Sequence, residues 1–250
     1  MIAFENLVKR YGPFTAVDGV SLKVPSGEIH GFLGPNGAGK TTTLRMIAGL
    51  LKPTSGRILV NGHDLAQEPE AAKMSLGFIP DRPFIYDKLT GGEFLRFHGG
   101  LYGLGEPVIA ERVREMLELF ELTRWENELV ESFSHGMKQR LVMCAAFLHR
   151  PQAVVVDEPM VGLDPRGARL IKDVFRRMSE RGVGILMSTH TLEVAQEMCD
   201  RISIILKGRI IAEGTVDELR RLAGTHDEQL TPVFLKLTGG SALQEIDEVL

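Results

Sequence analysis

Gly34-Pro-Asn-Gly-Ala-Gly-Lys-Thr41 is the stretch of sequence that decides the fold. Glycine at positions 34 and 39 permits backbone angles and close approaches that a Cβ atom would block, so successive N–H groups can point at phosphate oxygens. Lys40 would bring positive charge to the β- and γ-phosphates, and the Thr41 hydroxyl would ligate Mg²⁺. We expect the nucleotide to contact Gly34, Pro35, Asn36, Gly37, Ala38, Gly39, Lys40, Thr41 and Thr42.

The segments on either side of this loop support the same interpretation. Residues 28–33 (E-I-H-G-F-L) have the pattern of a short buried strand, and residues 41–51 have that of a helix. A helix that begins at the loop adds its dipole to anion binding. A glycine-rich loop between a strand and a helix therefore predicts a nucleoside-triphosphate site.

Composition excludes several classes of function. The 250 residues carry a net charge of −4, with a pI near 6.0, so a large nucleic-acid-binding surface is not expected. Cys144 and Cys199 stand at no metal-ligand or redox spacing, which suits a reducing cytoplasm. The first residues lack the pattern of a signal peptide, and no run of about 18 apolar residues could span a bilayer. Any action at a membrane is expected to require a partner.

The order of apolar segments predicts an α/β fold. Strand patterns at residues 2–8 and 15–24 indicate an N-terminal antiparallel β subdomain, and further strands are expected at 57–61 and 75–80. Beyond about residue 150 strands alternate with helices, which is typical of a mostly parallel sheet covered on both faces. The elements expected there are strands at 153–157, 184–189 and 202–206, a helix over about 167–180 and a short helix ending near residue 199.

Residues from about 90 to 150 have a helical pattern instead. One face of an amphipathic helix is formed by Ile109, Val113, Met116, Leu117 and Phe120. Residues 137–149 are almost continuously apolar, so a helix there should be buried nearly all round. We interpret this stretch as an inserted α-helical subdomain. The tail beyond residue 214 is polar with few apolar anchors, and its elements are not predicted.

A second chemical motif is Ala153-Val-Val-Val-Asp157-Glu158-Pro159, an apolar strand that ends in two carboxylates. A carboxylate at the tip of a buried parallel strand can reach the phosphate loop and hold Mg²⁺, which we expect of Asp157. The adjacent Glu158 can act as the general base that polarises an attacking water. Asp-Glu pairs also begin ordinary solvated turns, but the apolar run before this pair favours a functional site.

These motifs, with three more in the same order, resemble the ATP-binding cassette family over about residues 2–214. Ser134-His-Gly-Met-Lys-Gln-Arg140 is similar to the signature sequence of that family. Asp164 in Gly162-Leu-Asp-Pro165 looks like its D-loop, and His190 in Ser188-Thr-His190 looks like its switch histidine. Tyr11 resembles the aromatic residue that stacks on adenine, although plain loop packing beside Gly12 and Pro13 is the alternative.

The resemblance implies a P-loop nucleotide-binding domain over residues 1–214, with its helical subdomain at about 90–150, and a C-terminal extension over 215–250. It implies ATP and Mg²⁺ as cofactors and Lys40, Glu158 and His190 as catalytic residues. His190 would donate a hydrogen bond to the γ-phosphate. Thr41 and Asp157 would be the metal ligands, joined by the unusual Asp81.

In this family two cassettes enclose two ATP molecules head to tail. Ser134 and Gly136, at the N-terminus of a buried helix, would therefore contact the γ-phosphate of ATP held by a second subunit. Asp164 would lie at the contact between the subunits. The second cassette is either another copy of this chain or a different one, so a homodimer or a heterodimer is expected.

Two positions depart from the family pattern. The signature reads Phe-Ser-His-Gly-Met at residues 133–137 where Leu-Ser-Gly-Gly-Gln is commonest, and this variant resembles exporter-type cassettes with a separate membrane subunit. Asp81 stands where the family places a glutamine that ligates Mg²⁺ and senses the nucleotide. Asp81 keeps an oxygen ligand but adds negative charge; a solvated loop carboxylate or a cap on nearby N–H groups is the alternative.

The sequence thus predicts the ATP-hydrolysing subunit of an exporter, held at the cytoplasmic face of the cell membrane by a membrane-spanning partner subunit. Segment 81–89, with the exposed-looking Phe84, Ile85 and Tyr86, is expected to line a groove for a partner helix. Two alternatives remain: a soluble cassette ATPase outside transport, and a regulatory cassette that binds ATP with weak turnover. The first usually carries two cassettes, a coiled-coil insertion or basic extensions.

Overall fold

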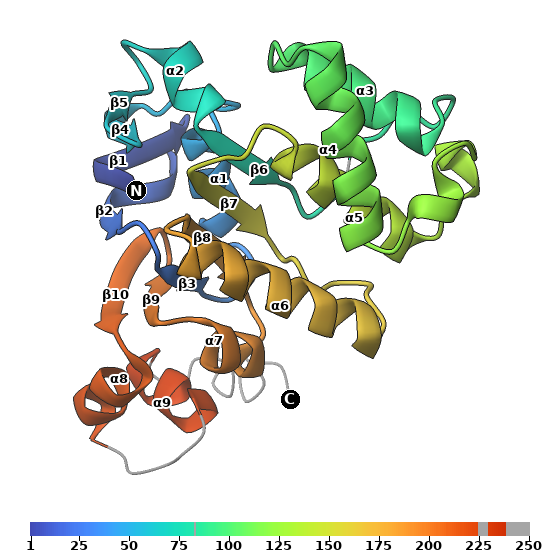
Figure 1. Ribbon diagram of the computed structural model, residues 1–250. Coiled ribbons are helices and arrows are strands. Elements are labelled where there is room, and N and C mark those ends of the chain that lie inside the picture. The colour runs from blue at the N-terminus through green and yellow to red at the C-terminus, as the bar shows by residue number, and fades with distance from the viewer. Residues whose placement is uncertain (83, 225–229, 239–250) are drawn as a thin grey trace.

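The computed structural model describes residues 1–82, 84–224 and 230–238, and the strands within these ranges form two sheets (Figure 1). The antiparallel sheet has the order β2-β1-β4-β5, and the larger sheet has the order β10-β9-β3-β8-β7-β6. In the larger sheet β9, β3, β8, β7 and β6 are parallel, and β10 pairs with β9 in the antiparallel sense. The antiparallel strands are β1 (Ile2–Tyr11), β2 (Phe14–Val24), β4 (Ser55–Val60) and β5 (His63–Asp64).

The parallel strands of the larger sheet are short and largely apolar because helices or the other sheet cover both of its faces. Every residue of its central strands β3, β7 and β8 is buried, as expected for parallel strands. The strands are β3 (Ile29–Leu33), β6 (Leu76–Ile79), β7 (Ala153–Asp157), β8 (Gly184–Thr189), β9 (Arg201–Leu206) and β10 (Arg209–Gly214).

Alternate residues of the larger sheet belong to two different cores. Phe32 and Val155 pack with helix α1 (Lys40–Ile47) and the antiparallel sheet. Leu33 and Val156 pack on the opposite face with α5 (His135–Phe147) and α6 (Pro165–Glu180). This two-sided packing holds the carboxyl ends of the strands, where the functional residues were expected, in a fixed arrangement.

The helical subdomain lies beside the two sheets, as the green and yellow helices of Figure 1 show. It contains α3 (Gly91–Leu101), α4 (Glu106–Leu119) and α5. The predicted apolar face of α4 is buried, including Val113 and Leu117 at 1% exposure each. Helix α5 is buried from Leu141 to Phe147, as predicted, but its first turn is exposed or partly exposed. The signature residues are at the N-cap and in that first turn.

Several elements differ from the sequence-based expectations. The helix expected to reach residue 51 ends at Ile47, because Gly49 takes the left-handed conformation (φ 69°) that stops a helix. Strand β1 extends to Tyr11 rather than ending near residue 8. Elements that were not predicted are β5, α2 (Pro69–Met74), β10, α8 (Val216–Ala223) and α9 (Leu230–Leu237). Helix α3 falls within the predicted helical stretch, and α7 (Leu192–Met198) matches the short helix expected before residue 199.

Part of the C-terminal tail, residues 225–229 and 239–250, lies outside the described residues. The boundaries proposed for the nucleotide-binding domain and the C-terminal extension therefore stay a prediction.

Candidate functional site

The phosphate loop connects β3 to α1, as its sequence predicted. Gly39 directly precedes α1 with a φ of 106°, a conformation that L-residues with a side chain rarely adopt. A Cβ atom at Gly39 would lie 2.6 Å from the carbonyl oxygen of Ala16, and one at Gly34 would collide with the carbonyl oxygen of Ile205. The loop is thus wedged between β2 and β9, and only glycine fits at these two positions.

Lys40 is held inside this loop. Its Nζ donates hydrogen bonds to the carbonyl oxygens of Gly34, at 2.6 Å, and Pro35, at 3.1 Å. The residue is 6% exposed, and burial lowers the pKa of Lys40, while the charges of Glu158 and Asp157 oppose that shift. The side-chain nitrogen of Lys40 is therefore held by the loop carbonyls, within electrostatic range of both carboxylates.

A cavity of about 380 Å³ lies next to the loop and brings most of the predicted site residues together. The hairpin β1–β2 contributes Tyr11, and the carboxyl ends of β7 and β8 lead to Glu158 and His190. The complete lining is Tyr11, Phe14, Ala16, Asn36, Gly37, Gly39, Lys40, Thr41, Thr42, Asp81, Glu158 and His190. Phe14 and Ala16 were not predicted, although Phe14 is one hairpin turn away from Tyr11.

Glu158 and His190 form a direct pair in this cavity. The His190 Nδ1 and the Glu158 Oε1 are 2.8 Å apart. Glu158 has a φ of 51°, unusual for a residue other than glycine, and its backbone N–H donates to the carbonyl oxygen of Ser188 at 3.1 Å. Such backbone strain is often found at functional sites, where surrounding contacts maintain it. The strained turn after β7 directs the carboxylate toward His190.

Asp157 lies deeper than Glu158 and does not line the cavity. It ends β7, is 2% exposed, and accepts a hydrogen bond from the Ser188 hydroxyl. Thr41 and Asp81 add a hydroxyl and a carboxylate oxygen at the cavity wall. Oxygen ligands of this kind suit Mg²⁺, which usually takes one or two protein carboxylates together with phosphates and waters. Among the described residues there is no group of three or more His, Cys, Asp or Glu side chains placed to hold a metal.

The predicted signature and D-loop residues are outside this cavity. The Ser134 hydroxyl caps α5 by accepting from the Met137 N–H at 3.3 Å. Asp164 caps α6 by accepting from the Gly167 N–H at 2.8 Å. Gly162 leaves no room for a Cβ atom because the His135 ring packs against it. The two motifs therefore contact each other, but within one chain they do not reach the cavity at the phosphate loop.

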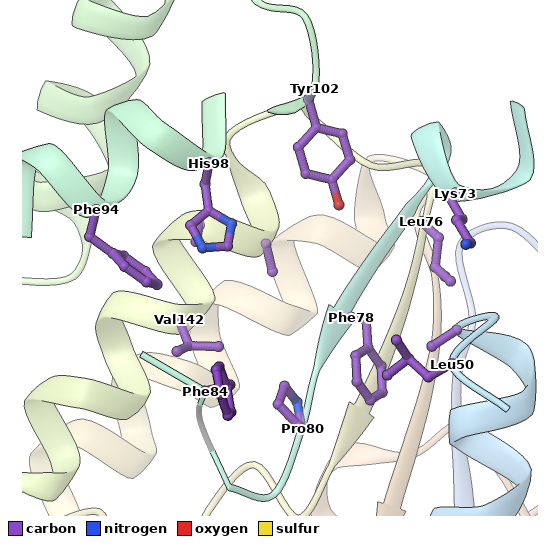
Figure 2. A pocket seen from close by; sticks show the side chains of 13 residues that line it. Leu50, Lys73, Leu76, Phe78, Pro80, Phe84, Phe94, His98, Tyr102 and Val142 are labelled. Atoms are coloured by element: carbon purple, nitrogen blue, oxygen red, sulfur yellow. The ribbon is translucent and has the colours of Figure 1, made fainter. Parts of the chain in front are cut away.

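A second cavity, of about 300 Å³, separates the end of β6 from helices α3 and α5 (Figure 2). Its wall includes Phe84, which is 86% exposed. Tyr86 is also exposed, as predicted, and its ring packs edge-on against the Phe97 ring, with the two ring centroids 5.5 Å apart. The prediction was wrong for Ile85, which is partly buried against the core. The residues labelled around this groove are Leu50, Lys73, Leu76, Phe78, Pro80, Phe84, Phe94, His98, Tyr102 and Val142.

Within the described ranges, no helix combines the length and apolar character needed to cross a membrane.

A parallel sheet with a phosphate loop before α1 and carboxylates after β7 defines a P-loop nucleoside triphosphatase. Comparisons with known proteins make this class more specific. The family model described as ABC transporter matches residues 17–161, which is more than half of the chain. The chain belongs to this family and is an ATP-binding, ATP-hydrolysing cassette, which confirms the resemblance seen in the sequence.

Curated relatives cover most of the chain. The linearmycin resistance ATP-binding protein LnrL of Bacillus subtilis is 40% identical over 232 residues, which are 92% of this chain and 75% of that protein. A daunorubicin resistance ATP-binding protein of Streptomyces coeruleorubidus is 40% identical over 223 residues, 89% of this chain and 71% of the relative. EcsA of Bacillus subtilis, an ABC-type transporter ATP-binding protein, is 34% identical over 98% of this chain and 99% of its own length.

Solved structures have the same fold. The ATP-binding subunit of an ABC transporter superposes with a TM-score of 0.90 at 36% identity, covering 95% of this chain and 99% of the other. A dimeric bacterial ABC transporter cassette gives a TM-score of 0.80 at 24% identity, over 86% of this chain and 98% of the other. Together these matches confirm the predicted α/β P-loop fold with its antiparallel and helical parts.

Proposed function

We propose that the chain is the ATPase subunit of an exporter and that it acts at the cytoplasmic face of the cell membrane, bound to a separate membrane-spanning subunit. The observation that carries the catalytic part is the single cavity shared by the phosphate loop, Asp81 and the Glu158–His190 pair. Export is supported by the names of the relatives, two of which are called resistance proteins. The apolar groove beside Phe84 supports a separate partner subunit.

The positions of the residues support the role that we propose for each. The loop N–H groups and Lys40 bind the phosphates, and Thr41, Asp157 and Asp81 hold Mg²⁺, which neutralises phosphate charge. Glu158 takes the proton of the attacking water as general base. His190, 2.8 Å from Glu158, orients that carboxylate and donates to the γ-phosphate. Tyr11 stacks on the adenine ring.

The remaining motifs are assigned to a second cassette, either another copy of this chain or a different one. The first turn of α5, with Ser134 and Gly136, is exposed or partly exposed and presents free N–H groups and a helix dipole. These features suit the γ-phosphate of ATP held by the second cassette. Asp164 caps α6 two residues after Gly162, which packs against His135 of the signature turn, and we assign it to the same contact.

Membrane vesicles turned inside out provide the test, because they expose the cytoplasmic face to added ATP. Vesicles that contain this chain and its membrane-spanning partner should hydrolyse ATP added outside, and vesicles with the Lys40→Ala variant should not. The chain should sediment with these membranes only when the partner is present. A chain that stays in the supernatant beside its partner would favour the soluble, non-transport alternative.

A first prediction concerns Asp81. A carboxylate should bind Mg²⁺ more strongly than a neutral amide, because hard cations prefer charged oxygen ligands. Asp81→Gln should need roughly three- to tenfold more Mg²⁺ for half-maximal ATPase activity while retaining substantial turnover, since the amide oxygen can still ligate. Asp81→Ala should lose more. Identical Mg²⁺ titrations of all three proteins would leave Asp81 as a solvated loop carboxylate.

A second prediction concerns the groove. Phe84→Ser should weaken association with partner-containing membranes by about tenfold or more, because buried aromatic anchors often dominate interface energies. ATP hydrolysis by the isolated chain should stay unchanged. Leu222→Ser is the matched control, since Leu222 is 62% exposed on α8, outside the groove. Equal sedimentation of the Phe84 variant and the control would argue against docking at this groove.

A further inference from the structure

The hairpin between β1 and β2 carries two aromatic residues that face each other. Tyr11 ends β1 and pairs directly with Phe14, the first residue of β2. The turn between them consists of Gly12, with a φ of 56°, and Pro13. Residues directly opposite in an antiparallel pair project their side chains on the same face of the ribbon. The two rings therefore leave the hairpin in the same direction.

Both rings are open to the nucleotide cavity. Phe14 is 62% exposed and Tyr11 is 49% exposed, and each belongs to the lining of the 380 Å³ cavity. Across the described part of the chain, the ring–ring contacts include neither of them. Phe14 thus presents an apolar aromatic surface that the folded chain itself leaves uncovered, at the site where the base is expected.

Lys9 restricts how Tyr11 can be used. Its Nζ lies 5.2 Å from the centre of the Tyr11 ring and donates a hydrogen bond to the carbonyl oxygen of Lys52 at 2.8 Å. One face of the Tyr11 ring is therefore occupied by a fixed ammonium group, in a cation–π contact. A base can stack on the other face only, so a second aromatic surface nearby would add contact area that Tyr11 alone cannot provide.

We propose that Phe14 is a second stacking contact for the nucleotide base and contributes to nucleotide affinity together with Tyr11. This inference rests on the proposed ATP site and extends it to a residue that carries no assigned role. Of the hairpin side chains that line the cavity, Phe14 and Ala16 have no polar atoms, and Tyr11 has only its hydroxyl. Stacking tolerates every base because every base has a π-face. Phe14 should therefore act on ATP and GTP alike.

The test compares nucleotides with inorganic tripolyphosphate, which has phosphates but no base. Phe14→Ala should weaken equilibrium binding of ATP and of GTP by about tenfold, the scale of one lost stacking contact. Binding of tripolyphosphate should stay within about twofold of wild type, because the phosphate loop is untouched. Phe14→Trp should bind ATP at least as well as wild type. Phe97→Ala removes another exposed phenylalanine, on α3, and should change the affinity for neither ligand.

The outcomes separate this inference from the proposed ATP site. Lys40→Ala should weaken the binding of both ATP and tripolyphosphate. If it weakens the binding of neither, the proposed phosphate site is wrong. Wild-type ATP affinity in Phe14→Ala, with weakened ATP binding in Tyr11→Ala, would overturn the role of Phe14 and leave the ATP site intact. If Phe14→Ala weakened the binding of ATP and tripolyphosphate equally, the stacking role would also be overturned, since Phe14 would then act through the structure of the loop.

Discussion

Glu158→Gln should lower ATP turnover by about 10²- to 10⁴-fold, the usual scale for loss of a general base. The amide has nearly the same shape as the carboxylate but cannot accept a proton from the attacking water. ATP binding should be retained, because the phosphate loop, Lys40 and Thr41 are unchanged. Steady-state hydrolysis and equilibrium ATP binding, measured on the same preparation, check both halves of this prediction.

The surroundings of Glu158 define the controls. Glu180→Gln changes an exposed carboxylate at the far end of α6 and should leave turnover unchanged. His190→Ala removes the partner that lies 2.8 Å from Glu158, so it should lower turnover while ATP still binds. Near-normal hydrolysis by Glu158→Gln would assign proton abstraction to His190 or Asp81, the other titratable groups of the cavity wall apart from Lys40 and Tyr11.

Predictions from the sequence worked best where backbone geometry leaves few alternatives. The phosphate loop needs glycine at positions 34 and 39 because main-chain oxygens of Ala16 and Ile205 stand where a side chain would be. The apolar run before Asp157 had to be a buried strand, and its end is where side chains of a parallel sheet converge. Sequence motifs thus located the phosphate loop and named Glu158 and His190 individually, whereas the contact between these two side chains is seen only in the structure.

The sequence was less informative where tertiary contacts decide. Phe14 has no recognisable motif, and only its register opposite Tyr11 directs it to the cavity. Ile85 belongs to an exposed-looking aromatic and apolar run, yet it packs against the core while its neighbour Phe84 stays exposed. Strand β10 follows a turn in which Lys207 and Gly208 have positive φ angles. Its sequence, Arg-Ile-Ile-Ala-Glu-Gly, does not alternate strictly between apolar and polar residues, so the pattern alone does not indicate an edge strand.

The separation of the signature turn from the phosphate loop leads to the last prediction. Ser134 caps α5 in the helical subdomain, whereas Lys40 is buried in the loop between β3 and α1. If each active site combines the loop of one cassette with the signature turn of another, damage to either motif should stop hydrolysis. Lys40→Ala and Ser134→Arg should each lower turnover by about 10²-fold or more, because each removes electrostatic stabilisation of the phosphates.

Mixing these two variants should restore activity if the chain forms homodimers. In a mixed dimer the intact loop of the Ser134→Arg chain faces the intact signature turn of the Lys40→Ala chain, so one complete site forms. Random pairing makes about half of the dimers mixed, each with one of two sites complete, so up to about a quarter of wild-type turnover should return.

Ser26→Arg, an exposed position before β3 and away from the loop, is the control for the added arginine and should remain active. Loss of the Ser134 cap costs about 1 kcal/mol, so thermal unfolding should show that each variant is folded. A mixture no more active than its separate components would mean that this chain does not build its sites across a dimer of two copies, and a different cassette would then have to supply the signature turn.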